Sequence, residues 1–202
     1  SLEELGDVWA ALRGSSIEAP FILEAFGSCR VGESLAVRAD EVELCESSGI
    51  TVAVVPIRRQ AGRMPGMVTD RLKTSTSRRW VVIPGPMGKR LGAIAAKRAK
   101  AGREWLCGVG SEPGWQSWFR TNWDRAIGQA GLRVLTPSTL RPAWQTISRY
   151  TLHVDQLIVE RLMGHKTPGV TGQHYDRPHR DDFINPVAEA YARHPYADGW
   201  DN

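Results

Sequence analysis

The sequence lacks long apolar runs and has very little cysteine. None of its 202 residues belongs to a stretch approaching the about 20 apolar residues that span a bilayer. The three cysteines, Cys29, Cys45 and Cys107, are widely spaced and form no CxxC pair, which argues against a disulfide framework and against a structural zinc site. The N-terminal segment SLEELGDVWA is acidic and amphipathic, unlike a signal peptide. We therefore expect a cytoplasmic protein with no membrane partner.

The common catalytic signatures are also missing. Five histidines are scattered along the chain, and neither HExxH nor a paired-carboxylate spacing occurs. The segment GPMGKRLG lacks the spacing of a phosphate-binding P-loop, and GxSxG is absent. The sequence thus predicts no metal site and no cofactor.

Positive charge is present but unevenly distributed. Residues 1–57 hold three basic groups against ten acidic ones, whereas residues 71–103 contain ten Lys or Arg and no acid. Such a run is either a solvated basic face or a surface for a polyanion, of which nucleic acid is the commonest.

Hydrophobic periodicity predicts one α+β domain, mainly helical with a small three-stranded antiparallel sheet. Strands are expected at 41–44, 50–57 and 79–84, with a loop at 58–67 between the last two. Helices are expected over 18–27, 31–37, 88–100, 115–130, 142–152, 154–163 and 185–193. The aromatic side chains of the 115–130 helix and Tyr150 are expected in the core. The last helix would dock either on a neighbouring protomer or on its own domain.

Five residues stand in contexts that could carry chemistry. Arg30 directly follows a tight turn that opens a helix, and Arg141 precedes a proline suited to a first helical turn. Lys73 lies at the approach to the third strand. His165 follows the helix-ending Gly164, and Tyr175 lies ten positions later. Taken singly, each residue type more often has a structural role, in a surface salt bridge or in packing.

Taken together, these segments resemble the catalytic domain of the tyrosine recombinase, or phage integrase, family. EAFGSCRVGESLAVRADEVE resembles the first conserved box, RLKTSTSRRWVVIP the lysine-bearing hairpin, STLRPAWQTISRY the second box and ERLMGHKTPGVTGQHYDRP the third. The resemblance covers residues 15–180, in the correct order. It implies that residues 1–202 are the catalytic domain and that the family's N-terminal core-binding domain is absent from this chain.

The resemblance also implies a role for each of the five residues. Arg30 and Arg141 would hold the scissile phosphate bidentately, since guanidinium groups match phosphate geometry and keep their charge. His165 would add a hydrogen bond to the same phosphate. Tyr175 would attack it to form a 3′-phosphotyrosyl bond, and Lys73 would protonate the departing 5′-oxygen. This chemistry needs neither metal nor ATP.

One position departs from the family pattern. Ser138 stands three residues before Arg141, where the family usually has a histidine, and Pro142 replaces a second histidine. Ser138 could bond the phosphate or accept the tyrosine proton through water, or it could merely cap the following helix. His174 could compensate or could point to solvent. Glu33 is expected to buttress Arg30 rather than react. Tyr150 is the rival nucleophile, but its place in a helix with Trp144 and Ile147 predicts a core position.

The implied partner is double-stranded DNA. The resemblance further implies a homo-tetramer on DNA for the full-length protein, an accessory DNA-bending or directionality factor, and a bacterial or phage-encoded mobile element. Two alternatives stay open. The chain could be a catalytically impaired, DNA-binding integrase relic, or it could be a type IB topoisomerase-like enzyme that uses the same chemistry.

Overall fold

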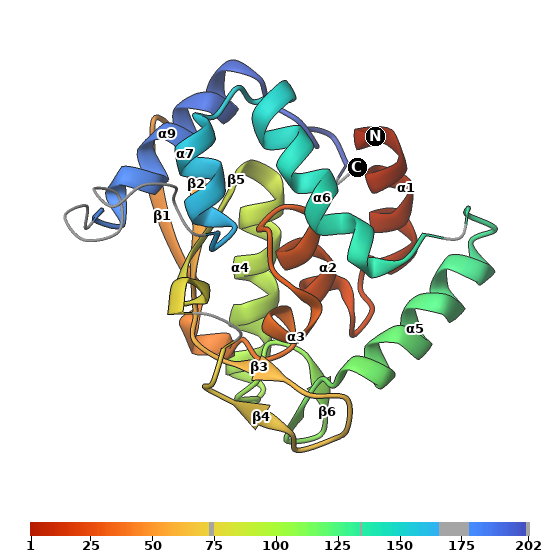
Figure 1. Cartoon of the computed structure of the whole chain (residues 1–202). Coiled ribbons are helices and arrows are strands. Elements are labelled where there is room, and N and C mark those ends of the chain that lie inside the picture. Colours follow the sequence, from red (N-terminus) through yellow and green to blue (C-terminus); the bar gives the residue numbers. More distant parts are fainter. Residues whose placement is uncertain (73–74, 134, 166–177, 201–202) are drawn as a thin grey trace.

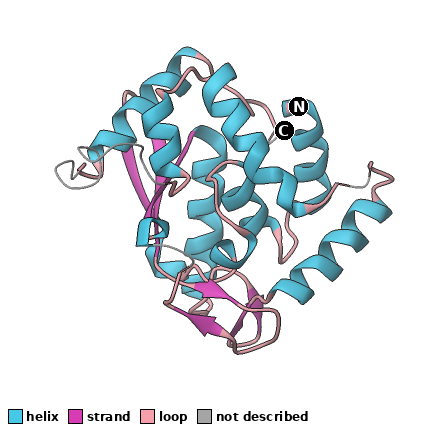
Figure 2. Ribbon diagram, viewed as in Figure 1, coloured by secondary structure: helices cyan, strands magenta, loops and turns pink. Residues whose placement is uncertain are grey.

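The computed structural model describes residues 1–72, 75–133, 135–165 and 178–200. The larger helices are α1 (Leu2–Leu12), α2 (Glu18–Ala25), α4 (Gly85–Lys100), α5 (Gln116–Gln129), α6 (Leu140–Thr146), α7 (Gln156–Leu162) and α9 (Asp181–Arg193). The short ones are α3 (Val31–Ser34), the 3₁₀ turns η1 (Ala39–Glu41), η2 (Ser75–Ser77) and η3 (Pro137–Thr139), and the π-helical turn η4 (Ile147–Thr151). Helices surround a small sheet (Figures 1 and 2).

The central sheet has three antiparallel strands, as the sequence predicts. They are β1 (Glu43–Ser47), β2 (Ile50–Ile57) and β5 (Arg79–Pro84), in the order β1-β2-β5. The second and third strands have the predicted bounds, and β1 begins two residues later than expected. Four consecutive residues of β2, 52–55, are buried, which means that both faces of the sheet are covered.

Helices α4 and α9 lie on opposite sides of the sheet (Figure 1). Alternate residues of β1 contact the two helices, as the pleat requires. Leu44 packs so close to Gly92 of α4 that a Cβ there would lie 2.6 Å from its side chain. Glu43 instead faces the other way and forms an ion pair with Arg180, at the start of α9 (2.5 Å).

The last helix packs on its own domain, which answers one of the open questions. Its apolar side chains are buried against the sheet; they are Phe183, Ile184, Val187, Ala188, Ala190 and Tyr191. Helix α9 also begins four residues earlier than predicted. No helix in the described part of the chain is long and apolar enough to cross a membrane.

Two expectations about local structure are wrong. Residues 58–67 are not only a loop, because β3 (Gln60–Ala61) pairs with β4 (Val68–Thr69) in a small hairpin. A second short hairpin joins β6 (Gly108–Val109) and β7 (Glu112–Pro113). Tyr150 is 68% exposed rather than in the core. It lies in the π-helical turn, whose wider spacing shifts side chains away from the 3.6-residue period.

Candidate active site

Arg30 is held at the start of α3 by a buried carboxylate. The turn before it places Ser28 at a φ of 61°, and Arg30 is the residue that caps the helix. Glu33 accepts a hydrogen bond from Arg30 Nη1 at 2.7 Å and another from the Arg30 backbone N–H at 2.9 Å. The prediction that Glu33 buttresses Arg30 is therefore confirmed.

Arg141, near the start of α6, reaches the same turn. Its Nη1 donates to the Ser28 carbonyl, and its Nη2 donates to the Met163 carbonyl at the end of α7. Helix α6 is held beside α2 by Trp144, whose indole N–H donates to the Phe26 carbonyl at 2.9 Å. Arg141 and Arg30 thus converge on one turn although more than a hundred residues separate them.

His165 joins the cluster from the end of α7. Gly164 ends that helix at a φ of 69°, a conformation that favours glycine. The Nδ1 atom of His165 bonds the Glu160 carboxylate, and its Nε2 lies 3.5 Å from Nη2 of Arg141. A carboxylate on one ring nitrogen orients the other. Glu160, which sequence reasoning missed, therefore directs Nε2 of His165 towards Arg141.

A third arginine, Arg79, also belongs to the cluster and was not predicted. Its side chain is only 5% exposed, and its Nη2 lies 2.9 Å from Oε2 of Glu33. Its Nη2 also donates to the Ser28 carbonyl at 3.2 Å. The structure places Arg79 on the same face of β5 as Val81 and Ile83, which contact Gly27 in the turn that leads to α3.

The cluster carries more positive than negative charge. Three guanidinium groups, those of Arg30, Arg79 and Arg141, lie around two carboxylates: Glu33, which bonds Arg30 and Arg79, and Glu160, which bonds His165. Burial and the charges of Arg79 and Arg30 lower the pKa of Arg141 to about 10, so that it remains cationic at neutral pH. Although burial opposes it, interactions with Arg79 and Arg30 lower the pKa of Glu33. A guanidinium has five N–H donors, and the bonds of Arg141 to the Ser28 and Met163 carbonyls use two of them, so the arrangement suits an oxyanion.

The neighbouring thiol is not a nucleophile. Cys29 stands between Ser28 and Arg30 but is buried, and burial raises the pKa of its thiol far above the usual range. The thiol therefore stays protonated. Within the described residues, no group of three or more His, Cys, Asp or Glu side chains could hold a metal ion.

The other predicted site residues are not placed in this cluster. Lys73, His174 and Tyr175 lie outside the described residues. Ser138 is exposed on η3, and its hydroxyl lies 2.8 Å from that of Thr136. The residue that caps α6 is Thr139, so the helix-capping interpretation of Ser138 is wrong. No described contact joins Ser138 to the arginines.

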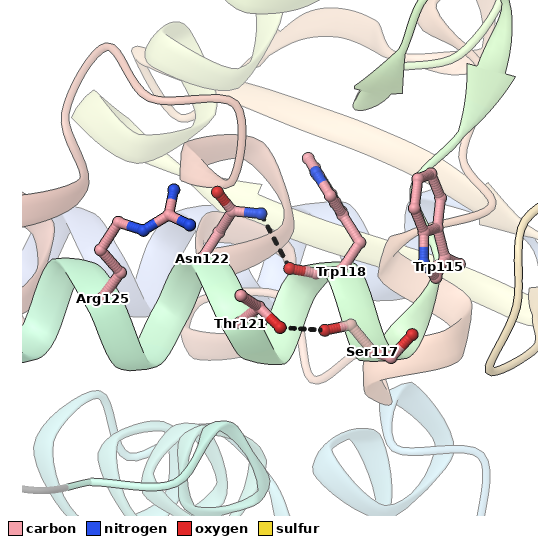
Figure 3. Close-up of a pocket in the computed structure, with 6 residues that line it drawn as sticks. All are labelled: Trp115, Ser117, Trp118, Thr121, Asn122 and Arg125. Atoms are coloured by element: carbon pink, nitrogen blue, oxygen red, sulfur yellow. Dashed lines mark hydrogen bonds between the residues drawn. The ribbon is translucent and has the colours of Figure 1, made fainter.

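A shallow groove on α5 lies apart from the cluster (Figure 3). Its volume is about 450 Å³, and it is lined by Trp115, Ser117, Trp118, Thr121, Asn122 and Arg125. Trp115 and Trp118 are half-buried and lie ring to ring at 5.8 Å, so the expected core position holds only for Phe119, Trp123 and Ile127 of this helix. The groove lining includes no buried charge, and α5 lies away from α7 (Figure 1).

The fold is that of a site-specific recombinase catalytic domain. A post-cleavage complex of the XerH site-specific recombinase with a palindromic difH substrate matches with a TM-score of 0.58 at 17% identity, over 89% of this chain and 48% of that chain. A pre-cleavage complex of XerH with difH matches with a TM-score of 0.54 at 18% identity, over 82% and 46%. No family model and no curated protein sequence matches the chain.

The likeness agrees with the tyrosine recombinase fold that the sequence resemblance implied. At this level of identity it shows the fold alone. The chain spans about half the length of the XerH chains, 48% and 46% in the two complexes.

Proposed function

We propose that this chain is the catalytic domain of a tyrosine site-specific recombinase that acts on double-stranded DNA. The observation that carries the proposal is the convergence of Arg30, Arg141 and His165, from three separate segments, around an excess of positive charge. A backbone phosphate of DNA is the anion that such a cluster suits, because guanidinium forks bind phosphate oxygens bidentately. The XerH neighbours were solved as DNA complexes, which supports the same partner.

In the proposed reaction, Arg30 and Arg141 neutralise the charge that develops on the phosphoryl oxygens. With Nδ1 bonded to Glu160, His165 donates a further hydrogen bond to the same group through Nε2 when that nitrogen also carries a proton. The Tyr175 hydroxyl releases its proton to water and its oxygen attacks phosphorus, the bond to the 5′-oxygen breaks, and Lys73 protonates that leaving oxygen. The resulting 3′-phosphotyrosine is itself a phosphodiester. A 5′-hydroxyl of another strand can therefore attack it and release the tyrosine without ATP.

The described neighbours of Lys73 and Tyr175 support these two assignments. Ser77, four residues after Lys73, has its hydroxyl 3.3 Å from Nη1 of Arg30. His165, which bonds Glu160 beside Arg141, is the last described residue before the segment that contains Tyr175. The segments that contain Lys73 and Tyr175 are therefore each continuous with a described residue of the cluster, Ser77 and His165 respectively. Ser138 is exposed, and we propose that its hydroxyl contacts the bound DNA phosphate.

The test is covalent trapping on nicked duplexes from a randomised library. A nick lets the short leaving strand diffuse away, so that a phosphotyrosyl adduct accumulates. Wild type should form an adduct that survives denaturation, and Tyr175→Phe should form none while it binds DNA as wild type does. Tyr150→Phe is the matched control, because Tyr150 is 68% exposed on a different turn and should leave the adduct unchanged.

Each outcome distinguishes a different function. An adduct retained by Tyr175→Phe would refute the assignment of the nucleophile. DNA binding without any adduct would favour an integrase relic, the alternative that Ser138 in place of the usual histidine raises. Relaxation of supercoiled DNA without strand exchange would indicate a type IB topoisomerase-like enzyme. The tetramer and any accessory factor are proposals for the full-length protein.

A further inference from the structure

Arg79 has the largest set of contacts of any residue in the cluster. Its Nε donates to the Leu162 carbonyl at 2.6 Å and its Nη1 to the Ser77 carbonyl at 3.0 Å. Its Nη2 donates to the Ser28 carbonyl at 3.2 Å and to Glu33 at 2.9 Å. One guanidinium thus joins four segments, namely the turn before α3, α3 itself, η2 and the end of α7.

Each of these contacts leads to a residue of the proposed phosphate site. Glu33 is the carboxylate that holds Arg30. The Ser28 carbonyl accepts from both Arg79 and Arg141, so it fixes the spacing of these two side chains. At the end of α7, a Cβ on Gly164 would lie 3.1 Å from Cδ of Arg79. His165 follows directly.

A purely structural arginine would be neutralised by its carboxylate, and Arg79 is not. Arg30 bonds the same Glu33, and Arg141 approaches on the other side through the shared carbonyl. Two cations near one acceptor repel each other, and the lowered pKa of Arg141 reflects this repulsion together with burial. The arrangement is costly until an anion enters, and Arg79 supplies both the geometry and part of the excess charge.

We infer that Arg79 is a positioning residue of the phosphate site: it sets the relative placement of Arg30, Arg141 and His165 without itself contacting the substrate. The inference rests on the proposed function, because it assumes that the cluster holds a phosphate. Its side chain is almost fully buried beneath the two more exposed members, Arg30 and His165. It acts through its four acceptors.

The experiment measures oxyanion binding at the cluster rather than stability. Sulfate is the probe, since it mimics a phosphate oxyanion and does not titrate near neutral pH. It is titrated against ¹⁵N-labelled protein at constant ionic strength, and the amide signals of Cys29 and Arg30 report binding at the site. The variants are Arg79→Lys and Arg79→Gln. The matched control is Arg90→Lys, which alters another arginine paired with a buried glutamate, Glu18, away from the cluster.

Arg79→Lys keeps the charge but cannot reach four acceptors at once, so we expect the sulfate dissociation constant to rise about tenfold, as for other residues that orient a binding group. Arg79→Gln should weaken binding further. The sulfate dissociation constant of Arg90→Lys should stay within about twofold of the wild-type value. This should hold even if the melting temperature of Arg90→Lys falls as much as that of Arg79→Lys. Equal weakening in Arg90→Lys, or wild-type affinity in Arg79→Lys, would overturn the inference.

A measurement on the wild type needs no variant to fold. The Arg79 Nε–H, bonded to Leu162, should exchange slowly with solvent both with and without sulfate, and rapid exchange in either state would contradict a fixed positioning role.

Arg141→Met separates this inference from the proposed function. If it binds sulfate as wild type does, or if wild type shows no saturable shifts, the phosphate site itself is wrong. If Arg141→Met binds sulfate more weakly but the Arg79 variants bind it with wild-type affinity, the phosphate site is correct and the inference about Arg79 fails.

Discussion

Glu18 and Glu33 are two carboxylates with the same exposure, 2% each, but with different partners. Glu18 bonds one arginine through both oxygens, with Nε and Nη2 of Arg90 at 2.6 and 2.9 Å, and it also accepts the Gly14 N–H at 2.7 Å. Glu33 instead bonds two arginines, Arg30 and Arg79. A third, Arg141, bonds the Ser28 carbonyl in the turn before α3 rather than Glu33.

The difference separates a structural ion pair from a binding site. A buried charge is costly unless it is paired and hydrogen bonded. Among the described residues, the Glu18 pair sets one positive charge against one negative charge. The Glu33 cluster keeps an excess of positive charge, which a bound anion would compensate. The ratio of charges within a cluster, rather than the presence of a buried arginine, therefore indicates function.

The largest expected effect is on the rate of covalent adduct formation. Arg141→Lys keeps the positive charge but loses the planar fork that fits phosphate. We expect the rate on nicked DNA to fall about 100- to 1,000-fold at saturating DNA, the loss typical of one transition-state donor. Single-turnover adduct formation on a denaturing gel measures it.

Arg90→Lys is the control for this prediction, because it changes the same residue type in the balanced pair. Its rate should remain within a few-fold of wild type at temperatures below its unfolding transition. A similar loss of rate in both variants would mean that the two arginine sites do not differ in function.

A second prediction concerns the two carboxylates. Glu33→Gln should lower the free energy of unfolding by about 3 kcal/mol, since it leaves buried arginines without their counter-charge. Glu18→Gln should lower it by a similar amount. Sulfate should restore part of the loss in Glu33→Gln but none beyond the general salt effect in Glu18→Gln. Thermal unfolding with sulfate or chloride at equal ionic strength makes the comparison.

The free energy of unfolding at acid pH should also depend on Glu33. Because the folded pKa of Glu33 lies below its ordinary value of 4.5, this residue contributes stability above pH 4.5. That contribution is lost as the pH falls from 4.5 through the lowered folded value. Glu33→Gln should therefore lose less stability than wild type over this range. Parallel curves for the two proteins would contradict the shifted pKa.

The smallest expected effect distinguishes two glycines with positive φ. Gly164→Ala at a φ of 69° would bring a Cβ to 2.8 Å from the Thr76 carbonyl, whereas Gly14→Ala at a φ of 77° would meet nothing within 4 Å. Both variants should lose about 1 to 2 kcal/mol of unfolding free energy from the left-handed backbone. Only Gly164→Ala should also weaken sulfate binding, because it displaces His165. Unfolding curves and the sulfate titration together test this.

Three residues of the site were singled out by the family resemblance, and each also stands in a recognisable local context. Arg30 follows a turn and opens a helix, Arg141 precedes a proline, and His165 follows a helix-ending glycine. Each of these is a signal from neighbouring residues, and the structure brings the three side chains to one turn. The strands 50–57 and 79–84 were equally readable, because their β-branched residues are continuous.

Arg79 and Tyr150 could not be read in the same way. In SRRW, two adjacent arginines look alike, and only the packing of β5 decides that Arg79 is buried while Arg78 is exposed. Tyr150 shares helical spacing with apolar neighbours, but a π-helical turn changes the period there. The roles of Lys73, Ser138 and Tyr175 rest on the family resemblance and remain predictions.

By itself, the sequence determined the α+β class and the antiparallel strands, because periodicity and turn chemistry act over a few residues, and its resemblance to a known family singled out the three converging side chains. Only the tertiary structure decided that Glu18 is balanced by one arginine and that Glu33 is shared by two, with a third close by. Charge balance in a buried site depends on groups brought together from distant segments. Residues 28, 33, 79, 141 and 165 meet only when the sheet, α6 and α7 have packed.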